Sequence, residues 1–520
     1  MILVAVSLSA AGAQAASFRP SPPLRASTDA RLDCLDASAD GRLVWWRDRR
    51  RTIRAGDLNA TEALGPSGSC PAGRVAADGS AVLGVVSDDD RGVRFALRPA
   101  GGRFSAFIDT PLPAGTAFVD VDRLAFNGEL VAFGAGIPDP DDSERPARPA
   151  VLVGGPGGAL QIVALPTRSP LPPGGPLTIE TLAGLDRAGR GLALYDGGGG
   201  ELRAARFDAG GTLEPPQRLA PPNDVSRFDP VRLAVAPDGT AAAAWIGRHR
   251  TTVVTGTTDR GFDLSTATTT ALDWSVAIAP DGGAVALGGR FRAAGDRLQI
   301  ATRAPGQPFT PARSYRSDGL EDPPPMAVEG GRYLLAFGPL YSWAGLGRTR
   351  AIAGRLGDPP GAPIAVPNAS AITEFTVPLL PSGGPATVLT MNQRRVRCPD
   401  CLSAHERREI GVYRISAHSP RRPAGVAVTA APRQRLDDSW AFRVKIVCPR
   451  PCAVRIVGGA RGSQDPDSGF DLSRTLEAGT TTLRVGFSVP PDRAFRARMH
   501  VAVDDATGEL RVRRTLVLNP

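Results

Sequence analysis

The chain has 520 residues, a formal net charge of +9, 42% hydrophobic residues and 22% charged residues. This composition is normal for a globular protein with a hydrophobic core, and it excludes a disordered chain. Glycine and proline number 60 and 49, which indicates the many tight turns that short antiparallel strands require. The length favours two domains.

Residues 1–16 have the features of a secretory signal peptide. Ile2 to Leu8 is apolar, and Ala13-Gln14-Ala15 matches a small-residue cleavage site. No arginine or lysine precedes Arg19, and a buried first strand is the alternative interpretation. No later apolar run reaches the roughly 18 residues that span a bilayer. We therefore expect an extracellular protein, secreted or associated with the cell surface, with no membrane span in its mature form.

The first strong internal pattern is a short phrase that recurs through residues 28–417. Each copy is an apolar stretch, a polar-Gly or Gly-Gly pair, and a second apolar stretch. The clearest copies carry an aspartate directly before glycine at Asp40, Asp78, Asp238 and Asp281, and a looser copy has Asn127 at this position. Asp-Gly and Asn-Gly tolerate the backbone of a two-residue hairpin, so each copy predicts two paired strands.

Looser copies of the phrase at Gly189, Gly331 and Gly384 bring the number of predicted hairpins to eight. The turn glycines recur about every 38 to 61 residues, and a four-stranded propeller blade takes roughly 40–50. The longer spacings contain Pro-rich insertions at 137–149 and 166–176. A repeat of this length that cannot bury both faces alone favours an array of stacked sheets.

Two of the copies resemble the PD40-type repeat of TolB-like β-propellers, in which a strand ends in a Pro-Asp-Gly turn. These are Pro237-Asp238-Gly239 and Pro280-Asp281-Gly282, while the copies at Asp40 and Asp78 lack the proline. The resemblance implies an all-β protein with a seven- or eight-bladed β-propeller over residues 17–418, and the hairpin count favours eight. Tandem immunoglobulin-like domains are the alternative, but they need units of about 100 residues.

The pattern changes beyond the Pro- and Arg-rich segment at 419–423. Apolar residues alternate with polar ones through 442–448, 452–456, 483–489 and 499–503. This alternation predicts short strands, and about seven of them in residues 419–520 indicate an Ig-like β-sandwich. The segment resembles the small Ig-like modules that trail many secreted actinobacterial proteins, with a C-x3-C at a strand end, and this resemblance implies no activity.

The cysteines fit an exported protein, because an even number in such a chain indicates disulfides. Proximity in the sequence predicts three pairs: Cys34 with Cys70, Cys398 with Cys401, and Cys448 with Cys452. A zinc site formed by the last two pairs is an alternative. A redox centre at Cys398-Pro399-Asp400-Cys401 is another, although no βαβ pattern surrounds it.

Arginine supplies nearly all of the positive charge, and Lys445 is the only lysine. The basic residues are scattered apart from a group at 47–54, and aromatic residues make up 6% of the chain. A nucleic-acid-binding surface concentrates charge and interleaves aromatics. We therefore expect no nucleic-acid partner.

Catalytic motifs are absent from the sequence. The histidines are His249, His405, His418 and His500, and they form no H-E-x-x-H motif; a G-x-S-x-G sequence and a P-loop are also missing. We therefore predict a monomeric, non-catalytic binding or scaffold protein that acts through a propeller surface, without a cofactor or metal. Its partner would be an extracellular protein or a polysaccharide.

An extracellular carbohydrate-active enzyme is the main alternative function, because two carboxylates across a propeller surface would suffice for glycoside hydrolysis. Tryptophans are candidates for a sugar platform, although tryptophan at the end of a repeat strand is also typical of packing between blades. These residues are Trp45, Trp46, Trp245, Trp274 and Trp343. An acidic loop at 139–144 has the oxygen ligands that calcium prefers, and a solvated loop is the alternative there.

Overall fold

The computed structural model describes residues 17–24, 34–48, 51–57, 61–67, 69–87, 92–138, 148–167, 180–222, 224–225, 231–247, 249–290, 296–317, 323–337, 349–366, 372–381, 384–396, 405–416, 425–438, 440–460, 469–487, 495–505 and 508–519. These residues form strands and turns, and no helix occurs among them. The predicted signal peptide, the acidic loop at 139–144 and the pair Cys398 and Cys401 lie outside them.

Eight four-stranded antiparallel sheets make up the described part of residues 17–416. Seven of them are formed by strands that follow one another along the chain. The first three sheets are β2 (Cys34–Ala37), β3 (Val44–Arg47), β4 (Thr52–Gly56) and β5 (Thr61–Pro66); β6 (Ala72–Val75), β7 (Ala81–Val86), β8 (Gly92–Arg98) and β9 (Ile108–Pro111); and β10 (Phe118–Phe126), β11 (Val131–Ile137), β12 (Arg148–Gly154) and β13 (Leu160–Ala164).

The next four sheets repeat this order. They are β14 (Leu182–Leu185), β15 (Gly191–Asp196), β16 (Leu202–Phe207) and β17 (Gln217–Ala220); β18 (Arg232–Val235), β19 (Thr240–Gly247), β20 (Arg250–Thr257) and β21 (Gly261–Thr270); β22 (Ser275–Ile278), β23 (Ala284–Arg290), β24 (Asp296–Arg303) and β25 (Arg313–Ser317); and β26 (Met326–Glu329), β27 (Arg332–Phe337), β28 (Arg350–Arg355) and β29 (Ile364–Ala365).

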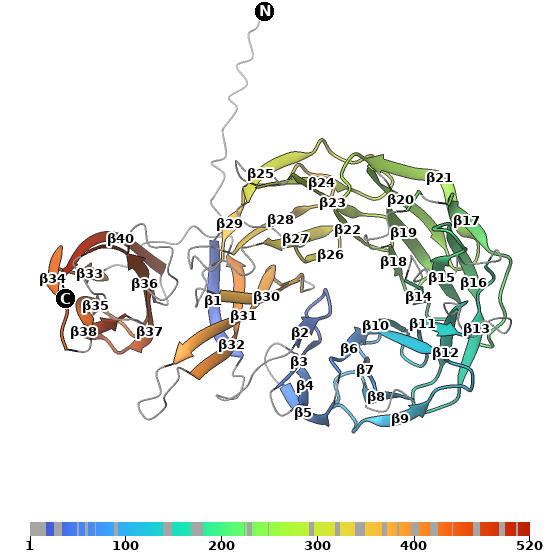
Figure 1. The fold of residues 1–520 in the computed structure, drawn as a ribbon, viewed down its shortest axis with the longest axis horizontal. Coiled ribbons are helices and arrows are strands. Elements are labelled where there is room, and N and C mark those ends of the chain that lie inside the picture. The colour runs from blue at the N-terminus through green and yellow to red at the C-terminus, as the bar shows by residue number, and fades with distance from the viewer. Residues whose placement is uncertain are drawn as a thin grey trace, which may run out of the picture.

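The eighth sheet joins the two ends of this region. It contains β30 (Ile372–Leu379), β31 (Thr387–Val396) and β32 (His405–Ser416), and its fourth strand is β1 (Ser17–Leu24). Ser17 pairs with Ser416, so the start of the described chain completes the sheet that ends the array. The eight sheets lie around a common centre, with the first strand of each of the seven consecutive sheets, and β30 of the eighth, nearest to it (Figure 1). We call these first strands, and β30 of the eighth sheet, the inner strands. The arrangement is consistent with propeller blades.

Packing between neighbouring sheets explains why their middle strands are apolar on both faces. Leu43 and Trp45 of the first sheet pack with Leu83 of the second, and corresponding clusters join each later sheet to the next. Leu35 of the first sheet packs with Leu389 of the eighth. All side chains of β15 are buried, because a sheet covered on both sides favours a continuous apolar run.

The hairpin loops between the first and second strands vary in length. At Gly330-Gly331, where Glu329 pairs with Arg332, the loop has two residues and both have positive φ (54° and 72°), as predicted. The hairpin at Asp238 differs from the prediction. Pro237, Asp238 and Gly239 form a three-residue loop, in which Gly239 N–H donates to Ala236 O (3.0 Å) and Ala236 N–H donates to Thr240 O (2.8 Å). Only the glycine has a positive φ, of 88°. This is a type I turn followed by a left-handed residue, the usual three-residue hairpin, whereas a two-residue turn would need positive φ at both positions.

Residues 425–519 form two further sheets. One contains β33 (Ala427–Thr429), β35 (Ala441–Cys448) and β38 (Gly479–Gly486), and the other contains β34 (Arg433–Arg435), β40 (Gly508–Asn519), β39 (Phe495–Asp505), β36 (Cys452–Ala460) and β37 (Gly469–Leu476). A single hydrophobic cluster, with Phe442, Ile456 and Val501 at its centre, includes residues from both sheets. Packing of two β-sheets face to face produces such a core.

Two of the three predicted cysteine pairs form disulfides. Cys34 at the start of β2 bonds to Cys70 just before β6, with Cα atoms 6.1 Å apart. Cys448 ends β35 and bonds to Cys452 at the start of β36, also with Cα atoms 6.1 Å apart. Because Cys448 and Cys452 bond to each other, they do not supply thiolates for the four-cysteine zinc site that the sequence also allows.

Candidate functional site

The predicted turn residues shape the hairpins themselves. Asp78 Oδ1 accepts hydrogen bonds from the backbone and hydroxyl of Ser80 at 2.9 and 2.6 Å, and these bonds lower the pKa of Asp78. Asp238 accepts from Thr240 N–H at 2.9 Å, and Asp40, Asn127 and Asp281 cap their own loops in the same way. The five residues therefore have a structural role.

Neighbouring hairpins also contact one another. Asn127 Nδ2 donates to Asp186 O at 3.0 Å, Arg187 N–H donates to Pro237 O at 3.0 Å, and Leu380 N–H donates to Ala39 O at 2.7 Å. These bonds bring the turns of successive sheets to the same end of the array.

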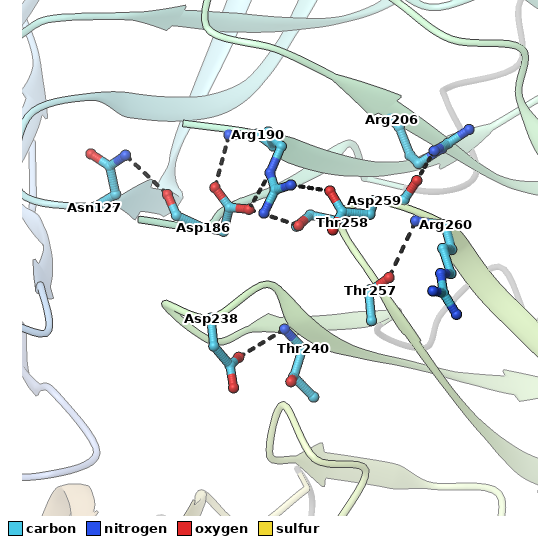
Figure 2. Close-up of polar contacts among 10 residues, drawn as sticks. All are labelled: Asn127, Asp186, Arg190, Arg206, Asp238, Thr240, Thr257, Thr258, Asp259 and Arg260. Atoms are coloured by element: carbon cyan, nitrogen blue, oxygen red, sulfur yellow. Dashed lines mark hydrogen bonds and ion pairs between the residues drawn. The ribbon is translucent and has the colours of Figure 1, made fainter. Parts of the chain in front are cut away.

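The strongest polar contact at this end holds the fourth sheet to the fifth. Asp186 is buried and accepts from Arg190 Nε at 2.8 Å. Arg190 also bonds to Asp259, which lies in the loop between β20 and β21, and Arg206 bonds to the backbone oxygen of Asp259. Figure 2 shows Arg190 between the two carboxylates. A half-exposed arginine between two aspartates in neighbouring sheets stabilises their packing.

The candidate tryptophans in the described part of the chain do not form a sugar platform. Trp45 and Trp46 are 1% exposed, and Trp245 is 4% exposed. They belong to the clusters that pack one sheet against the next. Trp274 packs partly buried against the cluster of the sixth and seventh sheets, and Trp343 lies outside the described residues.

Two inner strands are longer than the rest, β10 of the third sheet and β30 of the eighth. The described inner strands of the first, second and fourth to seventh sheets have four residues, whereas β10 runs from Phe118 to Phe126. Its pairing with β11 is irregular between Asp120 and Ala125. A β-bulge bends a strand and redirects its side chains, and bulges are common beside functional sites. This irregular segment contains Asp122 and Arg123.

Charged side chains from neighbouring sheets gather beside the irregular segment. We call them the inner-strand cluster: Asp36 on β2, Arg74 on β6, Asp120, Asp122 and Arg123 on β10, and Glu180 just before β14. Arg123 Nη2 lies 2.9 Å from Glu180 Oε2, and its Nη1 donates to Val231 O before β18 at 3.2 Å. Arg123 therefore connects the third sheet to the fourth and fifth.

The cluster is electrostatically unusual. Asp36 is accessible to solvent but enclosed by protein, and its partial desolvation raises its pKa, despite a hydrogen bond from Ala37 N–H and the attraction of Arg74. Desolvation likewise raises the pKa of Asp120, and Asp122 and Glu180 add repulsion. Burial lowers the pKa of Arg74. Clustered groups with shifted pKa values indicate a functional site.

Sequence analysis did not identify the inner-strand cluster. A partial signal was present. Register aligns Arg123-Leu124-Ala125-Phe126 with Arg232-Leu233-Ala234-Val235, so the arginine is shared by both copies, whereas Asp122 stands where the second copy has Val231. Asp36 and Arg74 carry no such local signal, since only the stacking of sheets brings them near β10.

The described residues contain no group of three or more His, Cys, Asp or Glu side chains arranged to hold a metal ion. The inner-strand cluster, with four carboxylates and two guanidinium groups, is suited instead to recognising charged or hydroxylated groups. No long apolar helix that could cross a membrane occurs in the described part of the chain.

Comparisons with known proteins are uninformative about activity. No family of known proteins matches the sequence, and no curated protein matches it. Solved structures with similarity to the chain include a polysaccharide lyase, Uly1, at 8% identity and a TM-score of 0.37, over 68% of this chain and 91% of the lyase. A eukaryotic initiation factor matches at 9% identity and a TM-score of 0.36, over 66% of this chain and 91% of that one. Prolyl oligopeptidase B from Galerina marginata matches at 10% identity and a TM-score of 0.36, over 70% of this chain and 55% of the peptidase.

Proposed function

We propose that this protein is a secreted, non-catalytic binding or scaffold protein whose ligand engages the inner-strand cluster of a closed, eight-bladed β-propeller. The C-terminal two-sheet unit is, in this proposal, an Ig-like module. The eight sheets, the pairing of β1 with β32 and the shared cluster of the eighth and first sheets support ring closure. Two disulfides are compatible with an extracellular location.

The observation that carries the proposal is the irregular β10. Register shifts occur in other sheets as well, but at β10 the irregular segment carries Asp122 and Arg123 and lies beside charged groups of neighbouring sheets. Propeller proteins bind ligands through surfaces around the centre of the ring. A cluster of mixed charge with partly desolvated carboxylates favours a ligand that supplies hydrogen-bond donors and a cationic or hydroxyl-rich group.

A binding panel tests this proposal. The full-length protein is screened against extracellular polysaccharides and immobilised basic, neutral and acidic peptides, in parallel with Asp122→Ala and Asp263→Ala. Both aspartates are exposed, but Asp263 lies on the outer strand β21. We expect the panel's best ligand to bind the Asp263 variant normally and the Asp122 variant at least tenfold more weakly. Equal binding by both variants would place the site elsewhere.

Glycoside cleavage is a second candidate, because Asp36 and Asp120 both have raised pKa values. A general acid in glycoside hydrolysis needs a raised pKa, and a second carboxylate acts as base or nucleophile. Release of reducing ends from the same polysaccharides would favour this candidate if Asp36→Asn abolished it while binding remained. Binding without product release supports the non-catalytic proposal.

A further inference from the structure

The outer face of the three-stranded C-terminal sheet is a flat, positively charged surface. We call it the cationic face, and its exposed residues are Arg443 and Lys445 on β35, Thr480, Thr482 and Arg484 on β38, and Thr429 on β33. They alternate with buried Phe442, Val444 and Ile446, which belong to the hydrophobic core. The period-two alternation of a strand therefore presents the charges on one side of the sheet.

Register places these residues in rows across the sheet. Lys445 lies opposite Thr429 on one side and Thr482 on the other, so it stands between two hydroxyls. In the adjacent row Arg443 lies directly opposite Arg484. Like charges that face each other across two strands destabilise a sheet, so this pair needs compensation.

Carboxylates of the protein neutralise only part of the positive charge on this face. Asp437 accepts from Arg484 Nε at 2.9 Å and from its Nη2 at 2.6 Å. Among the described residues no carboxylate pairs with Arg443 or Lys445. The Gln434 side chain bonds to the backbone of Arg443 at 2.9 and 3.0 Å. This contact places the edge of β34, with exposed Arg433 and Arg435, beside the face.

We propose that the cationic face docks a linear anionic polysaccharide, as a second binding surface separate from the inner-strand cluster. Anionic groups spaced along the polymer neutralise Arg443 and Lys445, and the flanking threonine hydroxyls donate to or accept from sugar hydroxyls. No aromatic side chain is exposed on the described part of this face. Single-stranded nucleic acids need aromatic side chains for base stacking, so the chemistry fits a sugar polymer better.

Substitution of the two cations tests the proposal. The full-length protein is measured against dextran sulfate, with neutral dextran as the uncharged probe. Arg443→Thr with Lys445→Thr replaces both cations by a β-branched residue, which a strand favours. We expect roughly tenfold weaker binding at low salt. The slope of the logarithm of the association constant against log salt is negative, and its magnitude should fall by about 1 to 2, because fewer counterions are released. Neutral dextran should not bind.

A matched variant separates this surface from general charge. Arg355→Ser with Arg474→Ser removes two exposed cations from β28 and β37, and it should bind dextran sulfate like the parent. Asp122→Ala should also bind dextran sulfate normally, so failure of this proposal is distinguishable from failure of the proposed function. Unfolding midpoints for every variant establish that the fold is retained.

The single lysine permits a chemical test without substitution. An amine-specific acetylating reagent neutralises Lys445 alone among the side chains, because no other lysine exists in the chain. Acetylation should weaken dextran sulfate binding by the parent and leave Lys445→Arg unaffected. Equal weakening of both proteins, undiminished binding by the Arg443 and Lys445 double variant, or tighter binding to duplex DNA than to dextran sulfate of equal charge would overturn the proposal.

Discussion

The hydroxyl of Thr258 donates a 2.7 Å hydrogen bond to Oδ2 of buried Asp186, and this bond joins the fifth sheet to the fourth. The same oxygen accepts from Arg190 Nε, while Oδ1 accepts from Arg190 N–H at 2.9 Å. One carboxylate therefore satisfies donors on two sheets. A buried acceptor of this kind is expensive to remove because its donors lose their partners.

Replacement of Asp186 by alanine should lower the free energy of unfolding by roughly 2–3 kcal/mol, since it leaves the buried Thr258 hydroxyl without its acceptor and removes one of the two carboxylates that Arg190 contacts. Asp238→Ala is the control, because that exposed carboxylate caps only its own turn through Thr240 (Figure 2). Chemical denaturation measures both variants. Equal losses for the two would show that the inter-sheet contact adds nothing beyond a turn cap.

The pH dependence of stability should reveal the partly desolvated Asp36. Its native pKa lies above the usual 3.8, so the native state holds the proton more tightly than the unfolded state. Stability of the parent therefore falls as pH rises from the unfolded value through the native one. Asp36→Asn removes that loss, and we expect a higher unfolding midpoint than the parent at pH 7 and no difference at pH below 3.8.

Asp263 provides the control of opposite sign for this pH series. Hydrogen bonds from Ser265 lower the native pKa of Asp263, so its contribution is present at neutral pH and is lost as pH falls through the lowered value. Asp263→Asn should therefore lower the unfolding midpoint slightly at pH 7 and converge with the parent in acid. Changes of the same sign in both variants would contradict the assignment.

The Cys34–Cys70 disulfide should stabilise the join between the first and second sheets. It closes a loop with a sequence separation of 36 residues, and a crosslink of that span contributes roughly 3–4 kcal/mol by restricting the unfolded chain. We expect the Cys34→Ala, Cys70→Ala variant to unfold at lower denaturant than the oxidised parent. Reduction of both proteins, which also opens Cys448–Cys452 in each, should abolish the difference, and a difference that survives reduction would point to lost packing instead.

The proposed closure of the ring would depend on β1. Deletion of residues 17–24 removes the strand that pairs with β32 from Ser17 to Leu24, and it exposes a long strand edge of the kind that promotes association. The deleted protein should show a lower unfolding midpoint and concentration-dependent oligomers by light scattering. A monomer of unchanged stability would mean that β1 contributes nothing to closure.

Local patterns allowed much of the fold to be predicted. The Asp-Gly and Asn-Gly phrases indicated paired strands, and the alternation from Phe442 to Cys448 indicated a sandwich strand; both are present. Completion of the last sheet by an N-terminal strand was one expectation for a closed ring, but the register of β1 against β32 could not be predicted, because residues 17 and 416 share no local signal. The loop at Asp238 has three residues instead of the predicted two. In this loop only Gly239 has a positive φ, and Asp238 accepts a hydrogen bond from Thr240 N–H.

The inner-strand cluster escaped prediction for a related reason. Asp36 and Arg74 belong to different sheets, and their proximity to β10 follows from the stacking of sheets rather than from sequence spacing. The exposure of a tryptophan side chain also could not be inferred from the sequence. Trp45, a candidate for a sugar platform, is buried, and its Nε1 donates to Pro71 O at 2.7 Å. Long-range packing thus decides which polar and aromatic residues are available to a ligand.

The most direct test of the proposed binding site is a hydrogen-exchange footprint of the full-length protein with the best-binding member of the polysaccharide and peptide panel. If the ligand engages the inner-strand cluster, amide exchange should slow in peptides that cover 34–37, 72–75, 118–126 and 180–185, and remain unchanged in the outer strand 261–270. Slower exchange confined to the outer strands or to residues 425–519, with 118–126 unaffected, would contradict the account.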